Sequence, residues 1–390
     1  MTEPAVTDFI YLDYAATTPV DDAVVARMRD CLALDGTFGN PSSIHAPGRA
    51  AAAKVEFARA QVGELLNTDP ENIIFTSGAT ESDNLAIIGG ARYRAHRGRH
   101  IVTMRTEHKA VLDAFSALER EGFEVTWLDP ASDGTLATET LEAALRDDTQ
   151  LVSIMHVNNE TGVIQDIAAL GALCRNRDIL FHVDAAQSVG KLPLDLARLP
   201  VDLLSLTAHK FYGPKGIGAL YIADRPGCHV EPLLWGGGQE KRIRPGTIPV
   251  HQVVGLGEAA AIAGQRIADN WNHVSELRQQ FLAGIEGLDE LLINGAKGYP
   301  GILNISAPGV EGESLMLALA PVCVASGSAC NAKTAEPSYV LRALGRSDLE
   351  AQAAIRFSFG RYTTARDVAV AAERYCSAVT ALRVLAAGLD

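Results

Sequence analysis

The stretch LFHVDAAQ at residues 180–187 carries the clearest fold signal in the chain. A short, mostly apolar run ends at a carboxylate, Asp184, and a turn of small residues follows at once. A second run of this kind, LLSLT at 203–207, is followed by His209 and Lys210. Short apolar runs bounded by turn residues are typical of strands buried on both faces of a parallel sheet. The sequence therefore predicts polar, chemically active residues at the carboxyl ends of two buried strands.

The same alternation of strand and helix patterns extends outward over residues 50–225. Strands that alternate with helices of ten or more residues predict an α/β fold, with a mainly parallel sheet covered on both faces. Helices are expected at 50–66, 81–96, 110–121 and 168–176, and strands at 73–76, 100–104, 124–128, 151–156, 180–184, 203–207 and 218–223.

The pattern changes after Pro249. Residues 253–288 are rich in helix formers with apolar residues at helical spacing, which predicts one or two long helices. Strands at 303–306 and 354–359 and a helix at 365–386 predict a second, smaller α+β unit, and Thr364 with Asp367 resembles a cap for its last helix.

Composition limits the class of protein. The 390 residues include 34 Lys and Arg against 47 Asp and Glu, and the net charge of −13 without a basic run argues against general binding to nucleic acid or anionic membranes. The first residues lack the basic and apolar parts of a signal peptide, and the apolar stretch 315–325 is too short to span a membrane. Six scattered cysteines without a CxxC motif fit a reducing compartment, so we expect a cytoplasmic protein.

Two patterns imitate functional motifs. GLGEAA at 255–260 matches a dinucleotide-binding pattern, but no returning strand follows it within about thirty residues, so we expect glycines within a helix. His96, His100 and His108 are irregularly spaced, so no metal site is predicted.

Three segments together predict a cofactor site. FTSGATE at 75–81 places a small-residue turn and a helix start after a strand, which suits a phosphate, although a plain helix cap explains it equally well. Asp184 could cap a helix or meet a cationic group, and Lys210 could be a solvated lysine or an imine-forming amine. A phosphate cup, a strand-end carboxylate and a lysine, in this order, are what pyridoxal phosphate requires.

Two further segments predict a substrate side. ASGSACNAKT at 325–334 is small and polar, so Cys330 is expected in a mobile loop, whereas Cys323 lies in an apolar run and is expected in the core. In the strand IRFSFG at 355–360, side-chain alternation places Phe357 on one face and Arg356 on the other. From that face Arg356 could clamp a carboxylate or point to solvent.

The sequence resembles the cysteine desulfurases of the NifS/IscS type, which are class-V aminotransferase-like enzymes of fold type I. The resemblance extends from 11 to 361 and rests on specific motifs. These are YLDYAATTP at 11–19, GNPSS at 39–43, SGATESDN at 77–84, EHKAV at 107–111, HVNNETG at 156–162, HVDAAQSVGK at 182–191, AHKFYGPKGIGAL at 208–220, RPGT at 244–247, SGSAC at 326–330 and EPSYVLRALG at 336–345.

The resemblance implies pyridoxal 5′-phosphate as cofactor, with a role for each matched residue. Lys210 would form the Schiff base, Asp184 would pair with the ring nitrogen, and His108 would stack on the ring and move protons. Cys330 would take the sulfur as a persulfide, Arg356 would hold the substrate carboxylate, and no metal is implied except Cys330 as a transient iron–sulfur ligand. The remaining cofactor contacts would come from Ala79, Thr80, Asn159 (also on the substrate side), Gln187, Thr207, His209 and, from the neighbouring subunit of a homodimer, Thr247.

The resemblance also implies a fold, a reaction and partners. The fold would be a seven-stranded large domain (16–262) plus a small domain (1–15 with 263–390) that carries the Cys330 loop. L-Cysteine would become L-alanine, and sulfur would pass to acceptor proteins for iron–sulfur cluster assembly or for tRNA or cofactor thiolation. The chain ends soon after its last helix, which puts the usual scaffold partner in doubt. Four alternatives remain open. The enzyme could catalyse selenocysteine lysis or another pyridoxal-phosphate reaction such as transamination, or it could be a desulfurase for DNA sulfur modification. The protein could also be a non-catalytic sulfur carrier or assembly partner. Cys31, Cys174, Cys228, Cys323 and Cys376 are expected to be structural.

Overall fold

A seven-stranded sheet forms the centre of the computed structural model, which describes residues 9–295, 298–326 and 336–387. Its strand order is β2-β8-β7-β6-β5-β3-β4. Neighbours from β7 to β4 pair in parallel, and β8 runs antiparallel to β7 and β2. The strands are β2 (Ile73–Thr76), β3 (His100–Met104), β4 (Glu124–Leu128), β5 (Thr149–Ser153), β6 (Leu180–Asp184), β7 (Leu203–Thr207) and β8 (Gly218–Ile222). The prediction of a mainly parallel seven-stranded sheet is confirmed.

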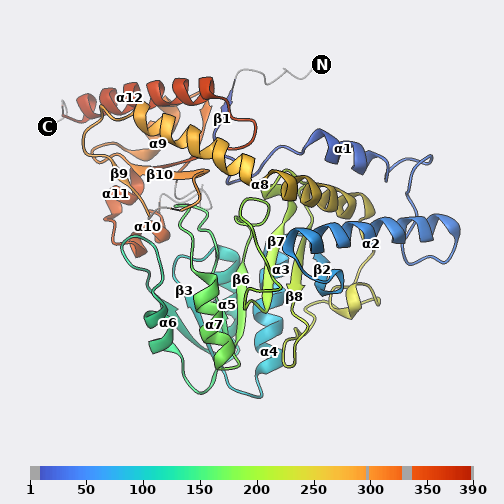
Figure 1. Cartoon of the computed structure of the whole chain (residues 1–390). Helices are drawn as coiled ribbons and strands as arrows, with labels where there is room; N and C mark the ends of the chain where they lie inside the picture. The colour runs from blue at the N-terminus through green and yellow to red at the C-terminus, as the bar shows by residue number, and fades with distance from the viewer. Residues whose placement is uncertain (1–8, 296–297, 327–335, 388–390) are drawn as a thin grey trace.

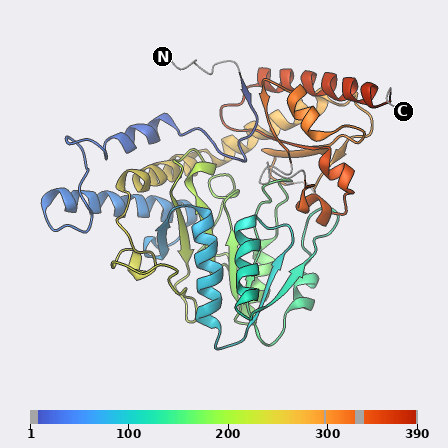
Figure 2. The same cartoon turned by 180° about the vertical axis from the view of Figure 1, so that it is seen from behind.

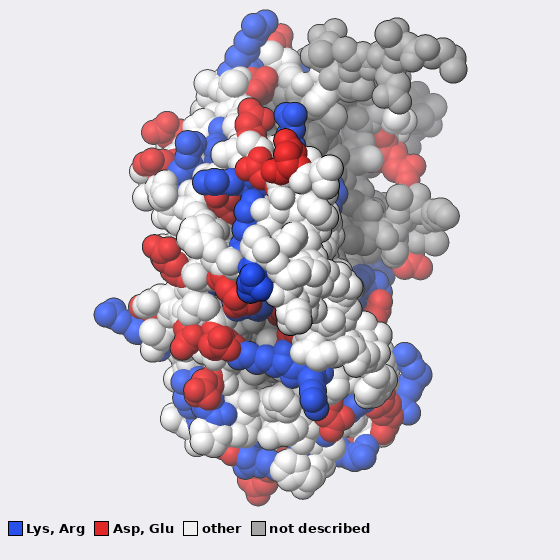
Figure 3. Space-filling model, turned by 90° about the vertical axis from the view of Figure 1, so that its right-hand side faces the viewer, with Lys and Arg blue, Asp and Glu red and all other residues white. Residues whose placement is uncertain are grey.

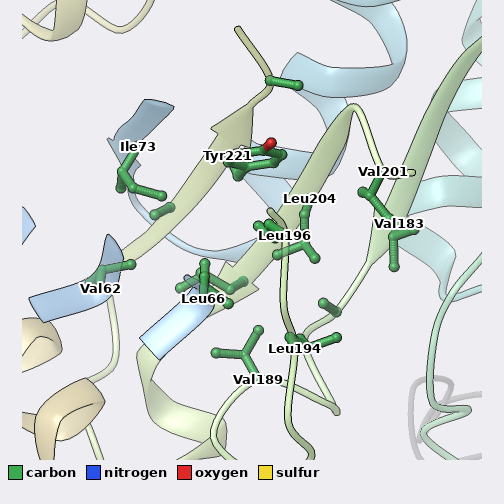
Figure 4. Close-up of a cluster of buried hydrophobic side chains, with 14 of the residues drawn as sticks. Val62, Leu66, Ile73, Val183, Val189, Leu194, Leu196, Val201, Leu204 and Tyr221 are labelled. Atoms are coloured by element: carbon green, nitrogen blue, oxygen red, sulfur yellow. The ribbon is translucent and has the colours of Figure 1, made fainter. Parts of the chain in front are cut away.

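Helices cover both faces of this sheet, and each face has its own apolar cluster. Figure 1 shows α7 in front of the sheet, and Figure 2 shows the helices of residues 79–120 in front of the opposite face. One cluster joins the sheet to α2, α7 and α8, and part of it appears in Figure 4, where the labelled side chains come from helix, strand and loop segments. The other cluster joins the sheet to the π-helical segment Leu85–Gly89, α4 and α5. These helices are α2 (Ala46–Leu66), α3 (Ala79–Asn84), α4 (Gly90–Arg94), α5 (Lys109–Arg120), α7 (Ile167–Asn176) and α8 (Val250–Gly284).

The alternation of side chains along β6 decides where its carboxylate points. Phe181 and Val183 belong to the cluster with α2 and α7, whereas Leu180 belongs to the cluster with α4 and α5. Because side chains alternate between the two faces of a strand, His182 and Asp184 lie on the same side as Leu180. Asp184 therefore faces the helices that follow β2 and β3.

A smaller antiparallel sheet, in the order β12-β13-β10-β9, lies beside the large one. α12 and α9 lie at this end of the molecule, as does β1 (Figure 1). Thr364 and Asp367 form the predicted reciprocal cap: the Asp367 carboxylate accepts from Thr364 N at 2.9 Å and Thr364 Oγ1 accepts from Asp367 N at 3.1 Å. The elements are β1 (Ile10–Tyr11), β9 (Leu292–Ile293), β10 (Ile302–Ser306), α9 (Gly312–Ala318), β11 (Val322–Cys323), β12 (Ala325–Ser326), α10 (Tyr339–Ala343), α11 (Asp348–Gln352), β13 (Ala354–Ser358) and α12 (Ala365–Ala387).

One helix, α8, connects the two apolar regions. Ala263 belongs to a cluster of the large sheet, and Val274 belongs to the cluster of the small sheet. The GLGEAA pattern lies inside α8, as predicted. A Cβ on Gly257 would lie 2.6 Å from Ala58 Cα, so this glycine allows α8 and α2 to pack closely. The remaining elements are α1 (Asp22–Arg29), α6 (Thr138–Ala144), a π-turn (Leu85–Gly89) and the 3₁₀ turns Pro70–Asn72, Ala208–Lys210 and Glu240–Arg242.

One expectation about local structure is wrong and another needs a refinement. The helix expected over 81–96 is present as a continuous helical run through α3, Leu85–Gly89 and α4, and its central segment Leu85–Gly89 is π-helical. Cys323 is exposed rather than in the core, because strand alternation buries its neighbour Val322 and turns Cys323 outward. Cys31 and Cys174 are buried, and Cys228 and Cys376 are partly buried.

The surface of the described residues carries charges of both signs. On the face in Figure 3, Lys and Arg side chains are interspersed with Asp and Glu. Among the described helices, none is both long enough and apolar enough to cross a bilayer.

Candidate active site

A hollow of about 550 Å³ lies where the carboxyl ends of β5, β6 and β7 meet the small sheet. Thr247 is exposed and does not line this hollow of its own chain, and Cys330 lies outside the described residues. All other predicted site residues line it: Ala79, Thr80, His108, Asn159, Asp184, Gln187, Thr207, His209, Lys210 and Arg356.

Asp184 is a buried carboxylate at the floor of the hollow. It is 4% exposed, and its Oδ1 accepts a hydrogen bond from Ala186 N at 2.9 Å. Burial raises the pKa of Asp184, while the Ala186 N–H, His108 and Lys210 oppose that rise. A carboxylate in this position is stabilised by any cationic group that enters the hollow.

Lys210 follows β7 on a 3₁₀ turn, and main-chain oxygens hold its amine. Its Nζ donates to Ala15 O at 2.6 Å and to Ala16 O at 2.8 Å. Next to it, His209 Nδ1 lies 3.1 Å from Thr17 Oγ1, and burial lowers the pKa of His209 to about 4. His209 is therefore neutral at physiological pH.

His108 caps α5 and faces the same hollow. Its Nδ1 accepts a hydrogen bond from Ala110 N at 3.1 Å. Burial lowers the pKa of His108, with Asp184 acting against this and Lys210 adding to it. A neutral imidazole that accepts at Nδ1 carries its proton on Nε2, so His108 can donate a proton from that atom.

The turn from β2 into α3 forms the opposite end of the hollow. Ser77 N donates to Glu81 Oε2 at 2.7 Å, and Arg244 Nε holds the same carboxylate through Oε1 at 2.8 Å. Ala79 and Thr80 lie in the first turn of α3, where N–H groups have no partner within the helix. These N–H groups and the Thr80 hydroxyl suit a phosphate.

Arg356 reaches the hollow from the small sheet. Its two Nη atoms donate to Asn159 O and to Asp13 Oδ1, both at 2.8 Å. Among the described residues, Arg356 Nε and Asn159 Oδ1 are buried without a hydrogen-bond partner. An Arg nitrogen without a partner at the edge of a hollow suits a carboxylate ligand.

The sequence reasoning gave no role to three ionisable residues near these groups. Asp83 and Glu107 are 1% and 0% exposed, and burial together with nearby carboxylates raises the pKa of both. Lys191 is partly buried, and its Nζ donates to Gln187 Oε1 at 2.6 Å. All three lie inside the quoted motifs, but only tertiary structure places them beside Asp184 and Gln187. No described group of three or more His, Cys, Asp or Glu is arranged to hold a metal.

The family model for "Aminotransferase class-V" matches residues 10–370. The chain is 55% identical to "Cysteine desulfurase IscS" of Proteus mirabilis (strain HI4320) over 379 residues, which are 96% of this chain and 94% of that one. The chain belongs to this family, as a cysteine desulfurase. A protein of the same name from Pseudomonas aeruginosa (strain LESB58) is also 55% identical, with the same coverage.

Solved structures agree with this assignment. A "NIFS-LIKE PROTEIN" has a TM-score of 0.88 at 36% identity and covers 95% of the desulfurase chain, which in turn covers 99% of it. "SspA in complex with cysteine" has a TM-score of 0.81 at 37% identity, with coverage of 91% of this chain and 99% of that one. The family depends on pyridoxal phosphate, and so does this desulfurase. The donor set fits the cofactor: N–H groups at α3 suit its phosphate, the buried Asp184 suits its ring nitrogen, and the Lys210 amine suits its aldehyde.

Proposed function

We propose that this desulfurase acts on L-cysteine with Lys210, Asp184, His108 and Arg356 as its working residues and Cys330 as the sulfur acceptor. The observation that carries the proposal is that a lysine, a buried aspartate and an arginine line one hollow. They come from the 3₁₀ turn Ala208–Lys210, from β6 and from β13, which are separate elements of the chain. A purely structural explanation would not require these groups to converge on one cavity.

Each protein group has a distinct task. Arg356 orients the substrate by its carboxylate, and Lys210 Nζ takes the proton from the substrate Cα. When bound, pyridoxal phosphate supplies an electron sink that stabilises negative charge at that carbon. Asp184 keeps a negative charge at the ring-nitrogen end, and His108 Nε2 holds a transferable proton.

Cys330 takes the sulfur in the step that follows. Its thiolate attacks the substrate sulfur, so an S–S bond forms while the C–S bond breaks. The carbon keeps the electron pair of the broken bond and takes up a proton on the way to alanine. The persulfide sulfur then passes to a thiol of an acceptor protein, and we propose a partner in iron–sulfur cluster assembly because the 55% identical relatives carry the name IscS.

The same proposal includes the assembly and the division into domains. A homodimer would bring Thr247, exposed in the single chain, to the phosphate end of the neighbouring hollow. We place the large domain at 16–262 and the small domain at 1–15 with 263–390. Separate apolar clusters on the two sheets support this division.

The test compares Cys330→Ala with Cys323→Ala, a matched control at an exposed cysteine of the same region. Purified protein receives L-cysteine, alanine is quantified, and persulfides are mapped by mass spectrometry. We expect Cys330→Ala to keep the visible absorbance of the cofactor and to lose persulfide and alanine, while Cys323→Ala behaves as wild type. A persulfide that persists in Cys330→Ala contradicts the assigned acceptor, and a wild-type protein that cannot be loaded with pyridoxal phosphate contradicts the whole proposal.

A further inference from the structure

Lys191 lies behind the hollow, at the end of the turn that follows β6. Its Nζ donates to Gln187 Oε1 at 2.6 Å and lies 5.5 Å from the centre of the Tyr299 ring. Burial is the main cause of a strongly lowered pKa for Lys191, and the neighbouring charges of Lys210 and Arg356 add to it. Keeping a lysine so close to two other cationic groups costs free energy, which calls for a compensating role.

The partner of Lys191 is a residue of the hollow itself. Gln187 is 3% exposed and lines the cavity, and its Nε2 donates to Ala15 O at 2.8 Å. An amide nitrogen has two hydrogens, so one N–H remains after the bond to Ala15. With Oε1 bound by Lys191 and one N–H bound by Ala15, the second N–H is left for a group in the hollow.

We propose that Lys191 is a positioning residue that acts through Gln187: it binds the amide oxygen and thereby presents the amide N–H to the ring oxygen of the cofactor. This inference rests on the proposed function and on the cofactor contact that the family resemblance implies for Gln187. Without Lys191, the Gln187 oxygen is a buried acceptor that lacks its partner, which is costly. The amide then rotates to find another donor, and the N–H no longer points at the ring oxygen.

A double-mutant cycle on cofactor binding tests this mechanism. Lys191→Met, Gln187→Met and the double variant are prepared as apoproteins and titrated with pyridoxal phosphate. We expect each single variant to bind the cofactor about 3- to 10-fold more weakly, the range expected for one lost hydrogen bond. The double variant should bind no more weakly than Gln187→Met, because Lys191 has no effect once its amide partner is gone.

Controls separate positioning from general stability. Lys54→Met is matched to Lys191→Met, since Lys54 is also a partly buried lysine that donates a hydrogen bond to a side chain, Cys31 Sγ at 3.7 Å, and this variant should bind the cofactor as wild type does. Lys191→Arg keeps a donor and should restore part of the lost affinity and the wild-type absorbance maximum. If Lys191→Met does not fold, Lys191→Gln, one bond shorter than lysine, replaces it in the cycle.

The outcomes distinguish this inference from the function it rests on. Additive losses in the double variant, or an unchanged affinity and absorbance maximum in Lys191→Met, overturn the positioning role. Failure of the wild-type protein to bind pyridoxal phosphate overturns the proposed function instead.

Discussion

Replacing Glu160 with glutamine should change how the stability of the protein depends on pH. Glu160 is 6% exposed, and its Oε2 accepts a hydrogen bond from Ser338 Oγ at 2.6 Å. Burial raises its pKa from 4.5 to about 7, although Ser338 and Arg356 both act in the opposite direction. The folded state therefore favours the protonated form of Glu160 more strongly than the unfolded state does.

The sign and size of the effect follow from that difference. A carboxyl group whose pKa is higher in the folded state makes the protein less stable as pH rises, and the loss occurs between the unfolded and folded pKa values. The pKa rises from 4.5 to about 7, or 2.5 units, which corresponds to about 3 kcal/mol. Glu160→Gln cannot ionise and escapes this loss, so its stability relative to wild type should increase by about that amount from pH 4.5 to about pH 8.

Urea unfolding of the cofactor-loaded protein across this pH range measures the difference. The raised pKa values of Asp83, Asp184 and Glu107 affect both proteins equally, so they cancel when wild type and variant are compared. Glu350→Gln is the control, because Ser347 lowers the pKa of this carboxyl from 4.5, so its titration lies below the range and its stability difference from wild type should stay flat between pH 4.5 and about pH 8. A stability difference between Glu160→Gln and wild type that stays constant over the range refutes the reasoning.

Three other substitutions have expected outcomes. Glu240→Gln should cost about 3 kcal/mol of unfolding free energy in urea titrations, because it breaks a buried ion pair in which Arg59 Nη2 lies 2.7 Å from the carboxylate; a loss below about 1 kcal/mol, the range of exposed pairs, would contradict a buried role. Arg356→Gln should raise the KM for L-cysteine about tenfold or more while the cofactor absorbance remains. A variant that also loses the cofactor absorbance would argue against a specific substrate role. Gly257→Ala should lower the thermal midpoint, since its Cβ would lie 2.6 Å from Ala58 Cα and overpacking costs about 1–3 kcal/mol; an unchanged midpoint would mean that α8 shifts freely.

Local patterns were enough for the centre of the fold and not for its connections. The ranges 180–184 and 203–207 match β6 and β7, because uninterrupted apolar runs between turn residues have few alternatives. The helix expected over 81–96 is present, but its central segment Leu85–Gly89 is π-helical, and the chain packs closely there: a Cβ on Gly89 would lie 2.4 Å from Glu231 O. The hydrophobic periodicity of residues 81–96 cannot reveal a contact with Glu231, which is far away in the sequence.

The candidate site, too, is only partly predictable from the sequence. Asp184 and Lys210 could be singled out because a strand end and a turn are visible in the sequence. The contact of Arg356 with Asp13, 343 residues apart, could not be derived from either segment alone. Lys191 was missed because a lysine four residues after a glutamine is ordinary, and only the fold makes it partly buried beside other cations.

Acidic and basic residues lie on opposite sides of the hollow, which favours one orientation of a bound ligand. Asp83 and Glu107 lie near Asp184, behind the floor made by the large sheet, and the burial that raises the pKa of both also makes a further negative charge costly there. Lys191 and Arg356 lie on the side of the small sheet. With the roles proposed above, a substrate carboxylate would be attracted to Arg356, and a protonated ring nitrogen would be favoured at Asp184 and disfavoured at the other side. The reverse orientation would bring like charges together, so this arrangement would orient cofactor and amino acid before any bond changes.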